Sequence, residues 1–264
     1  MCARALLGWV VLSAAALAAL GCGGAREMPD EPPADPDKGA LTGDLAVQLA
    51  QTLIEAGAHG TAVPMLRSAL AKDPKDARLH YLMATVLRDR GVYRQAREEY
   101  AIALELQPSL APAHAGLAVL LDLEGKHDEA KPLHEKAIAL QPDVPRYLNN
   151  LGFSRYLAGD HQAAIEAFEK ALRLEPNAPT VYNNLGFALA ALGRDDEAKR
   201  MFRQSLDEAA SLNNLALAHE LRGDPSAARR MYQEALLVDP SLKAALANLE
   251  ALDKGGAPPA EETE

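Results

Sequence analysis

The chain has 264 residues, 48% of them hydrophobic, which is enough apolar material for a sizeable buried core. Only 5% are aromatic, a composition that suits helices packed at close range. The formal net charge is −10 at pH 7, and the sequence contains no basic stripe, which argues against nucleic acid as a partner.

Residues 1–21 have the features of an export signal. Arg4 supplies a positive start, and the 15 apolar residues from Leu6 to Leu20 are too few for a comfortable bilayer span. The run ends in Ala-Leu-Gly-Cys, which resembles the lipobox of bacterial lipoproteins, where the chain is cut before a cysteine that then carries acyl chains. The alternative is a plain signal peptide followed by a chance cysteine.

Cys22 is the residue that this resemblance marks for lipidation. Cleavage would remove Cys2, so the mature chain would hold one cysteine and no internal disulfide. By the same resemblance, Gly23 in place of an aspartate implies sorting to the outer membrane, on the leaflet that faces the periplasm, although the inner membrane stays open. Two or more acyl chains make such anchoring durable.

Residues 22–42 are rich in Pro, Gly, Ala and Asp and hold few large apolar side chains. Such a composition cannot offset the entropy of ordering, so we expect a disordered tether. The tail 254–264 has the same character.

Most of the remaining chain repeats one unit with a period of 34 residues. In the unit 145–178 a Leu-Gly pair is followed by a glycine, an alanine, an aromatic residue, a second alanine and a proline. These marks are Leu151, Gly152, Gly159, Ala164, Phe168, Ala171 and Pro176. A period of this size indicates a stacked solenoid, in which each unit contacts mainly its neighbours.

Each unit has the pattern of two helices joined by a tight turn. Apolar residues recur at helical spacing in both halves, and Gly159 and its equivalents supply the left-handed residue that ends a helix. Pro176 and its equivalents stop the second helix, and prolines such as Pro179 open the next one.

The motif as a whole resembles the tetratricopeptide repeat (TPR) family. The resemblance implies an all-α fold, a right-handed superhelix of antiparallel helix pairs over 43–253. The expected repeats are 43–76, 77–110, 111–144, 145–178, 179–208 and 209–242, with a capping helix at 243–253. Repeat one lacks the aromatic residue, and His134 replaces it in repeat three.

Repeat five is short. Pro176 and Pro240 are 64 residues apart, four fewer than two periods, and the missing residues belong after Leu206. We therefore expect a local break in the stacking at 200–216, or a nearly continuous helix through it.

The sequence contains no pattern of reactive residues typical of an enzyme. It lacks a zinc HExxH motif, a phosphate-binding loop and a GxSxG nucleophile, and we expect no catalytic residue, cofactor or metal. His80 and His114 occupy equivalent places in successive repeats, where a bulky residue usually fills the start of the first helix.

Three asparagine pairs stand at one register of the first helices of repeats four to six. They are Asn149 and Asn150, Asn183 and Asn184, and Asn213 and Asn214. In the TPR family the first helices line a concave groove, where such amides can hold the backbone of an extended peptide. Alternatively, one asparagine of each pair bonds between repeats and holds the stack.

The same stretch contains the other residues of a predicted partner groove. Phe153 and Phe187, with Tyr156 beside them, would form an apolar floor, and Arg146 could meet an acidic group. Tyr81, Arg88 and Asp122 lie on similar faces of repeats two and three and could serve another partner or only the stack.

These features predict a non-enzymatic scaffold that binds a protein or peptide and is held to the membrane by an N-terminal lipid. A lipoprotein of about six TPR units is similar to the pilus-assembly lipoproteins, namely the TPR component of the Tad (Flp) system and the pilotin of type IV pili. The resemblance implies a pilus or secretin component as partner. The alternative is an adaptor that recruits periplasmic cell-envelope enzymes or proteases.

Overall fold

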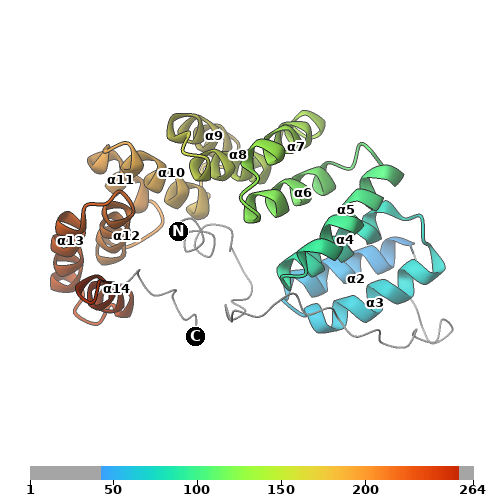
Figure 1. The fold of residues 1–264 in the computed structure, drawn as a ribbon, viewed down its shortest axis with the longest axis horizontal. Helices are drawn as coiled ribbons and strands as arrows, with labels where there is room; N and C mark the ends of the chain where they lie inside the picture. The colour runs from blue at the N-terminus through green and yellow to red at the C-terminus, as the bar shows by residue number, and fades with distance from the viewer. Residues whose placement is uncertain (1–42, 256–264) are drawn as a thin grey trace. The chain divides into compact units, whose positions relative to one another are not determined.

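The computed structural model describes residues 43–255 and shows 13 helices and no strand in that range (Figure 1). The predicted all-α fold is therefore confirmed. The predicted signal segment, Cys22, the tether and nearly all of the tail lie outside the described residues.

The chain forms two compact units, which divide between Pro142 and Asp143. Each unit is a series of helix pairs, in which the first helix packs against the second helix of the same repeat. The first unit contains α2 (Gly43–Glu55), α3 (His59–Lys72), α4 (Ala77–Asp89), α5 (Tyr93–Leu106), α6 (Ala111–Leu123) and α7 (His127–Leu140). The second contains α8 (Pro145–Leu157), α9 (His161–Leu174), α10 (Pro179–Ala191), α11 (Asp195–Phe202), α12 (Glu208–Leu221), α13 (Pro225–Val238) and α14 (Lys243–Asp253).

The turns between paired helices have the glycine geometry that the sequence predicts. The turn glycine of every repeat has a φ between 67° and 83°, a conformation that a residue with a Cβ adopts only with strain. Pro145, Pro179 and Pro225 stand in the first turn of their helices, where no backbone hydrogen bond is lost.

Small residues at the helix crossings let the two helices of a repeat approach closely. The crossing alanines are fully buried; they are Ala62, Ala96, Ala130, Ala164, Ala198 and Ala228. One large side chain per repeat fills the space next to this crossing, which we call the slot, and this side chain is also fully buried. These slot residues are Leu66, Tyr100, His134, Phe168, Phe202 and Tyr232. They form the core, as expected.

A glycine sixteen residues before each slot phenylalanine makes room for its ring. A Cβ on Gly152 would lie 2.6 Å from Phe168 Cε1, and one on Gly186 would lie 2.5 Å from Phe202 Cε1. Where the slot holds another residue, this position is alanine, as in Ala216 opposite Tyr232. The ring and the small residue beneath it are therefore matched within each repeat.

The slot residue is also matched to the residue that stands twelve positions before it in the sequence. Where the slot residue is polar, this partner is charged and touches it. Arg88 Nη1 donates to the Tyr100 hydroxyl at 3.4 Å, Asp122 Oδ2 lies 2.8 Å from His134 Nε2, and the Tyr232 hydroxyl donates to Glu220 Oε2 at 3.1 Å. In the two phenylalanine repeats the partners are Tyr156 and Ala190.

These contacts show what Tyr81, Arg88 and Asp122 touch in repeats two and three. Asp122 is 5% exposed and also contacts His127 Nδ1 at 2.8 Å, and Tyr81 packs at a tilt against Tyr100 with 6.3 Å between ring centroids. Since a buried polar group costs free energy unless it is paired, Arg88 and Asp122 serve the core of their own repeats.

The short repeat is closed by a short second helix. α11 has 8 residues, whereas the second helix of each other repeat has 14, and α12 begins six residues after α11 ends, compared with five between the other repeats. The Asp207 side chain accepts from the Ala210 amide and so caps α12. The expected alternative of a nearly continuous helix is therefore wrong, because the chain turns between Phe202 and Asp207.

We expect Gly152→Ala to destabilise the second unit by about 1–3 kcal/mol, because the added methyl group would overlap the fully buried ring of Phe168. The matched control is Gly60→Ala, also within a helix, where an added Cβ meets nothing within 4 Å. That change should be neutral or stabilising by up to about 1 kcal/mol. Urea unfolding of the purified protein measures both, and equal effects would contradict the proposed fit.

We expect Tyr232→Phe to cost about 1 kcal/mol at pH 7 and less at pH 4. Burial raises the pKa of Glu220, while the Tyr232 hydroxyl opposes that shift by bonding the carboxylate. A group with a raised folded-state pKa contributes most stability below its unfolded pKa and loses it as pH rises through the folded pKa. Removing the hydroxyl raises the pKa of Glu220 further, so the loss should grow with pH. A difference that is constant from pH 4 to pH 7, in urea unfolding, would contradict this account.

Candidate partner-binding face

The asparagine pairs lie on the first helices of the second unit. Within this unit α8, α10 and α12 follow the inner side of the curve, and α9, α11 and α13 follow its outer side (Figure 1). α8 contacts α10, and α10 contacts α12, so equivalent residues of successive first helices are neighbours.

The pairs form a hydrogen-bond ladder from repeat to repeat. Asn184 Nδ2 donates to Asn149 Oδ1 at 2.9 Å, and Asn214 Nδ2 donates to Asn183 Oδ1 at 2.8 Å. The capping helix continues the ladder, because Asn248 Nδ2 donates to Asn213 Oδ1 at 3.1 Å. The second asparagine of a repeat thus bonds to the first asparagine of the preceding repeat, which is one of the two roles expected from the sequence.

The six asparagines of the pairs differ in how far they are exposed. Asn184 and Asn214 are buried, whereas Asn149 and Asn183 are partly exposed and use only their Oδ1 atoms in the ladder. Asn213 is buried, and its Nδ2 turns back to Asn214 Oδ1 at 3.3 Å.

Asn150, at the start of the series, is partly exposed. The amide donors that the ladder leaves unused on partly exposed asparagines are therefore those of Asn149, Asn150 and Asn183.

The aromatic residues of the predicted groove contribute mainly to packing. Phe153 and Phe187 are 5% and 3% exposed, and Phe187 meets Phe202 edge-on with 5.1 Å between centroids. Tyr156 is partly exposed and stacks with Phe153 at 6.4 Å.

Two titratable rings in repeat four stay neutral near pH 7. Burial raises the pKa of Tyr156 to about 12, and burial also lowers the pKa of His161, whose ring lies 5.3 Å from that of Tyr156. Arg146 is exposed, and its guanidinium carbon lies 5.8 Å from the Tyr147 ring centroid, within the range of a cation–π contact.

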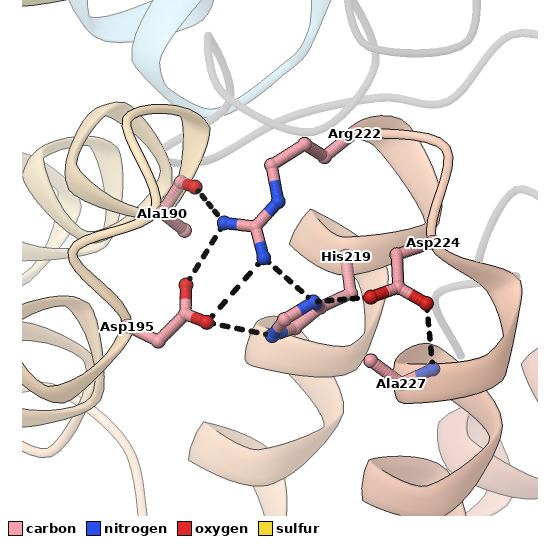
Figure 2. A network of polar contacts seen from close by, with 6 residues as sticks. All are labelled: Ala190, Asp195, His219, Arg222, Asp224 and Ala227. Atoms are coloured by element: carbon pink, nitrogen blue, oxygen red, sulfur yellow. Dashed lines mark hydrogen bonds and ion pairs between the residues drawn. The ribbon is translucent and has the colours of Figure 1, made fainter.

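A polar network that sequence reasoning missed joins repeats five and six (Figure 2). Arg222 Nη1 donates to the Ala190 carbonyl at 2.7 Å and to Asp195 Oδ1 at 3.0 Å, and Arg222 Nη2 donates to His219 Nδ1 at 2.9 Å. His219 Nε2 lies 3.0 Å from Asp195 Oδ2.

One signal for this network was visible in the sequence. His219 is buried at a register where Leu87, Leu121 and Leu189 are buried in other repeats. A histidine in place of leucine requires polar partners, so this substitution could have identified the network.

The helix-start histidines close local turns. Nε2 of His80 lies 3.1 Å from the Pro74 carbonyl oxygen, and Nε2 of His114 lies 2.9 Å from that of Pro108. His80 Nδ1 also lies 2.6 Å from Glu99 Oε2. These contacts are structural, and among residues 43–255 no group of three or more His, Cys, Asp or Glu side chains is arranged to hold a metal ion.

None of the described helices is both long and apolar enough to span a bilayer.

Three profiles of the repeat family match the chain. One, described as TPR repeat, matches residues 154–193, and two, described as tetratricopeptide repeat, match 53–120 and the pair 180–207 and 209–238. Together they cover more than half of the sequence. No curated protein matches the chain.

Solved structures share the fold over most of the chain. PilF of Pseudomonas aeruginosa is 25% identical with a TM-score of 0.60, over 75% of this chain and 92% of PilF. PilW, a type IV pilus biogenesis factor, is 19% identical with a TM-score of 0.65, over 79% of this chain and 96% of PilW. YrrB, a TPR protein with an unusual peptide-binding site, is 23% identical with a TM-score of 0.52, over 69% of this chain and 95% of YrrB.

The repeat marks, the helix pairs and the matching profiles agree, and the chain is therefore a tetratricopeptide repeat protein whose fold resembles those of PilF and PilW.

Proposed function

We propose that this protein is a non-enzymatic scaffold, anchored by a lipid on Cys22 in the periplasm, that holds a protein component of a pilus or secretion apparatus during assembly. The observation that carries the proposal is the likeness to PilF, which extends over 92% of that protein at 25% identity. PilW, a type IV pilus biogenesis factor, shares the same fold and supports the proposal at the level of architecture alone.

The inner side of repeats four and five supplies the chemistry for such binding. Because Asn184 and Asn214 occupy the Oδ1 atoms of Asn149 and Asn183, the ladder fixes both side chains with Nδ2 as the remaining polar atom. Two oriented N–H donors, one repeat apart, match carbonyl oxygens of an extended peptide. Arg146 is exposed beside them and suits an acidic group on the partner.

The proposal places the protein on the inner leaflet of the outer membrane, facing the periplasm through which a secretin or pilus component passes. Acyl chains on Cys22 would hold the protein there. The segment 22–42 would span roughly 25 Å as a flexible chain, which gives the repeats room to reach a partner.

We expect Asn149→Asp combined with Asn183→Asp to weaken partner binding while leaving stability nearly unchanged. Aspartate keeps the oxygen that accepts from Asn184 and Asn214 but replaces the outward Nδ2 donor by a carboxylate oxygen. Binding is measured by site-specific cross-linking in native membranes to the secretin or pilus component, and stability by thermal melting.

The matched control for this pair is Asn184→Asp, which removes a ladder donor and sets a carboxylate against Asn149 Oδ1. It should lower the melting midpoint. If the double variant melts like this control, Asn149 and Asn183 hold the stack and do not bind a partner.

We expect Cys22→Ser to release the protein from the membrane as a soluble periplasmic species, since no acyl chain can then be attached. Fractionation of cells with and without a high-salt wash measures this. Retention of the variant in salt-washed membranes would contradict lipid anchoring but would leave the scaffold proposal intact.

The decisive test of the function is loss of the gene. We expect surface pili, or multimers of the secretin in the outer membrane, to be lost and to return with the wild-type chain. Normal assembly, with a cell-envelope hydrolase as the cross-linked partner, would instead favour an adaptor that recruits periplasmic enzymes.

A further inference from the structure

We call the contact between two successive repeats a joint. The joint between repeats five and six is formed by a shorter second helix than the other joints. The second helix of a repeat lies between its own first helix and the first helix of the next repeat. At this joint that helix is α11, with 8 residues, whereas at the preceding joint it is α9, with 14. The apolar surface that α11 can offer to α12 is correspondingly smaller.

Charged side chains lie where the apolar surface is reduced. At one end of α11, Asp195 and the Ala190 carbonyl hold Arg222 of repeat six, and Asp195 also pairs with His219 (Figure 2). At the other end, Lys199 Nζ lies 3.0 Å from Glu208 Oε1, and Arg203 also pairs with Glu208. Ion pairs thus cross the joint at both ends of the short helix.

The preceding joint has a different composition. At two positions it has a buried apolar residue where the short joint has a polar one: Ile165 corresponds to Lys199, and Val181 corresponds to Ser211. The buried Phe168 and Leu185 have buried counterparts at the short joint, Phe202 and Leu215. A ladder bond crosses each of the two joints, from Asn184 to Asn149 at this one and from Asn214 to Asn183 at the short one. Apolar burial depends little on ionic strength, so this joint serves as an internal reference.

The ion pairs of the short joint are open to screening by salt. The side chains of Asp195, Arg222, Lys199 and Glu208 are between 29% and 36% exposed. At this exposure each pair contributes at most about 1 kcal/mol, and that contribution falls as the Debye length shrinks. In a solenoid, stability is a sum of repeat and nearest-neighbour terms, so a weak joint opens before the rest.

We propose that the joint between repeats five and six is an electrostatic hinge, at which repeat six and the capping helix separate from repeat five when the ion pairs of Asp195 and Glu208 are screened or removed. The hinge lies between Asn183 and Asn213 on the inner side and therefore governs the continuity of that face. This inference stands on the geometry of the joint and does not require the proposed partner.

The test is hydrogen exchange of the full chain at about 0.02 M and about 0.5 M NaCl, where Debye lengths are about 20 Å and about 4 Å. We expect amide exchange in α12, α13 and α14 to accelerate by about twofold to tenfold at high salt, while exchange in α8, α9 and α10 changes little. The variants Asp195→Asn and Glu208→Gln should each produce the same local acceleration at low salt.

Glu197→Gln is the matched control, because it removes one negative charge from the same helix but breaks a pair with Arg194 that stays within repeat five. It should leave exchange in α12–α14 unchanged. The hinge is refuted if Asp195→Asn and Glu208→Gln behave like this control, or if salt changes exchange equally in α8–α10 and in α12–α14.

Discussion

The close fit of one large side chain against one small residue is the constraint on which each repeat depends. Phe168 and Phe202 lie against glycines whose missing Cβ atoms leave just enough room for the rings. The helices of a pair can approach to this distance only because the crossing residues, such as Ala164, are also small. Without this approach the first and second helices would not bury a common face, and the stack would have no repeating core.

The same fit accounts for the polar residues that are buried inside the repeats of this protein. A phenyl ring over glycine tolerates Tyr156 or Ala190 as its partner, whereas a hydroxyl or imidazole in the slot requires a charged partner, as in Tyr232 with Glu220. The asparagine ladder follows the same rule between repeats, because each buried amide of α10 and α12 donates to its neighbour. Polar groups that satisfy one another in the core are not available to a partner, which narrows the candidate binding atoms to those of Asn149, Asn150, Asn183 and Arg146.

Joints held by apolar burial and joints held partly by ion pairs respond differently to the salt concentration. Joints closed by apolar burial hold under most solution conditions, while a joint closed by half-exposed ion pairs responds to ionic strength. The shortness of repeat five therefore does more than shorten a helix, because ion pairs replace part of the apolar contact at this joint. A scaffold that binds a long partner along its inner side can change the spacing of repeats five and six at such a joint.

The amino-acid sequence by itself determined the helix pairs, the glycine turns, the capping helix and the place of the short repeat. These features depend on residues close together in the chain, and the 34-residue period reports them six times over. Only the tertiary structure decided which asparagine of each pair bonds to the next repeat, that Arg88 and Asp122 serve the core, and that His219 joins Asp195 and Arg222. The reason is physical, because most of these contacts join residues 12 to 35 positions apart, and all of them depend on side-chain direction and helix register, which periodicity does not specify.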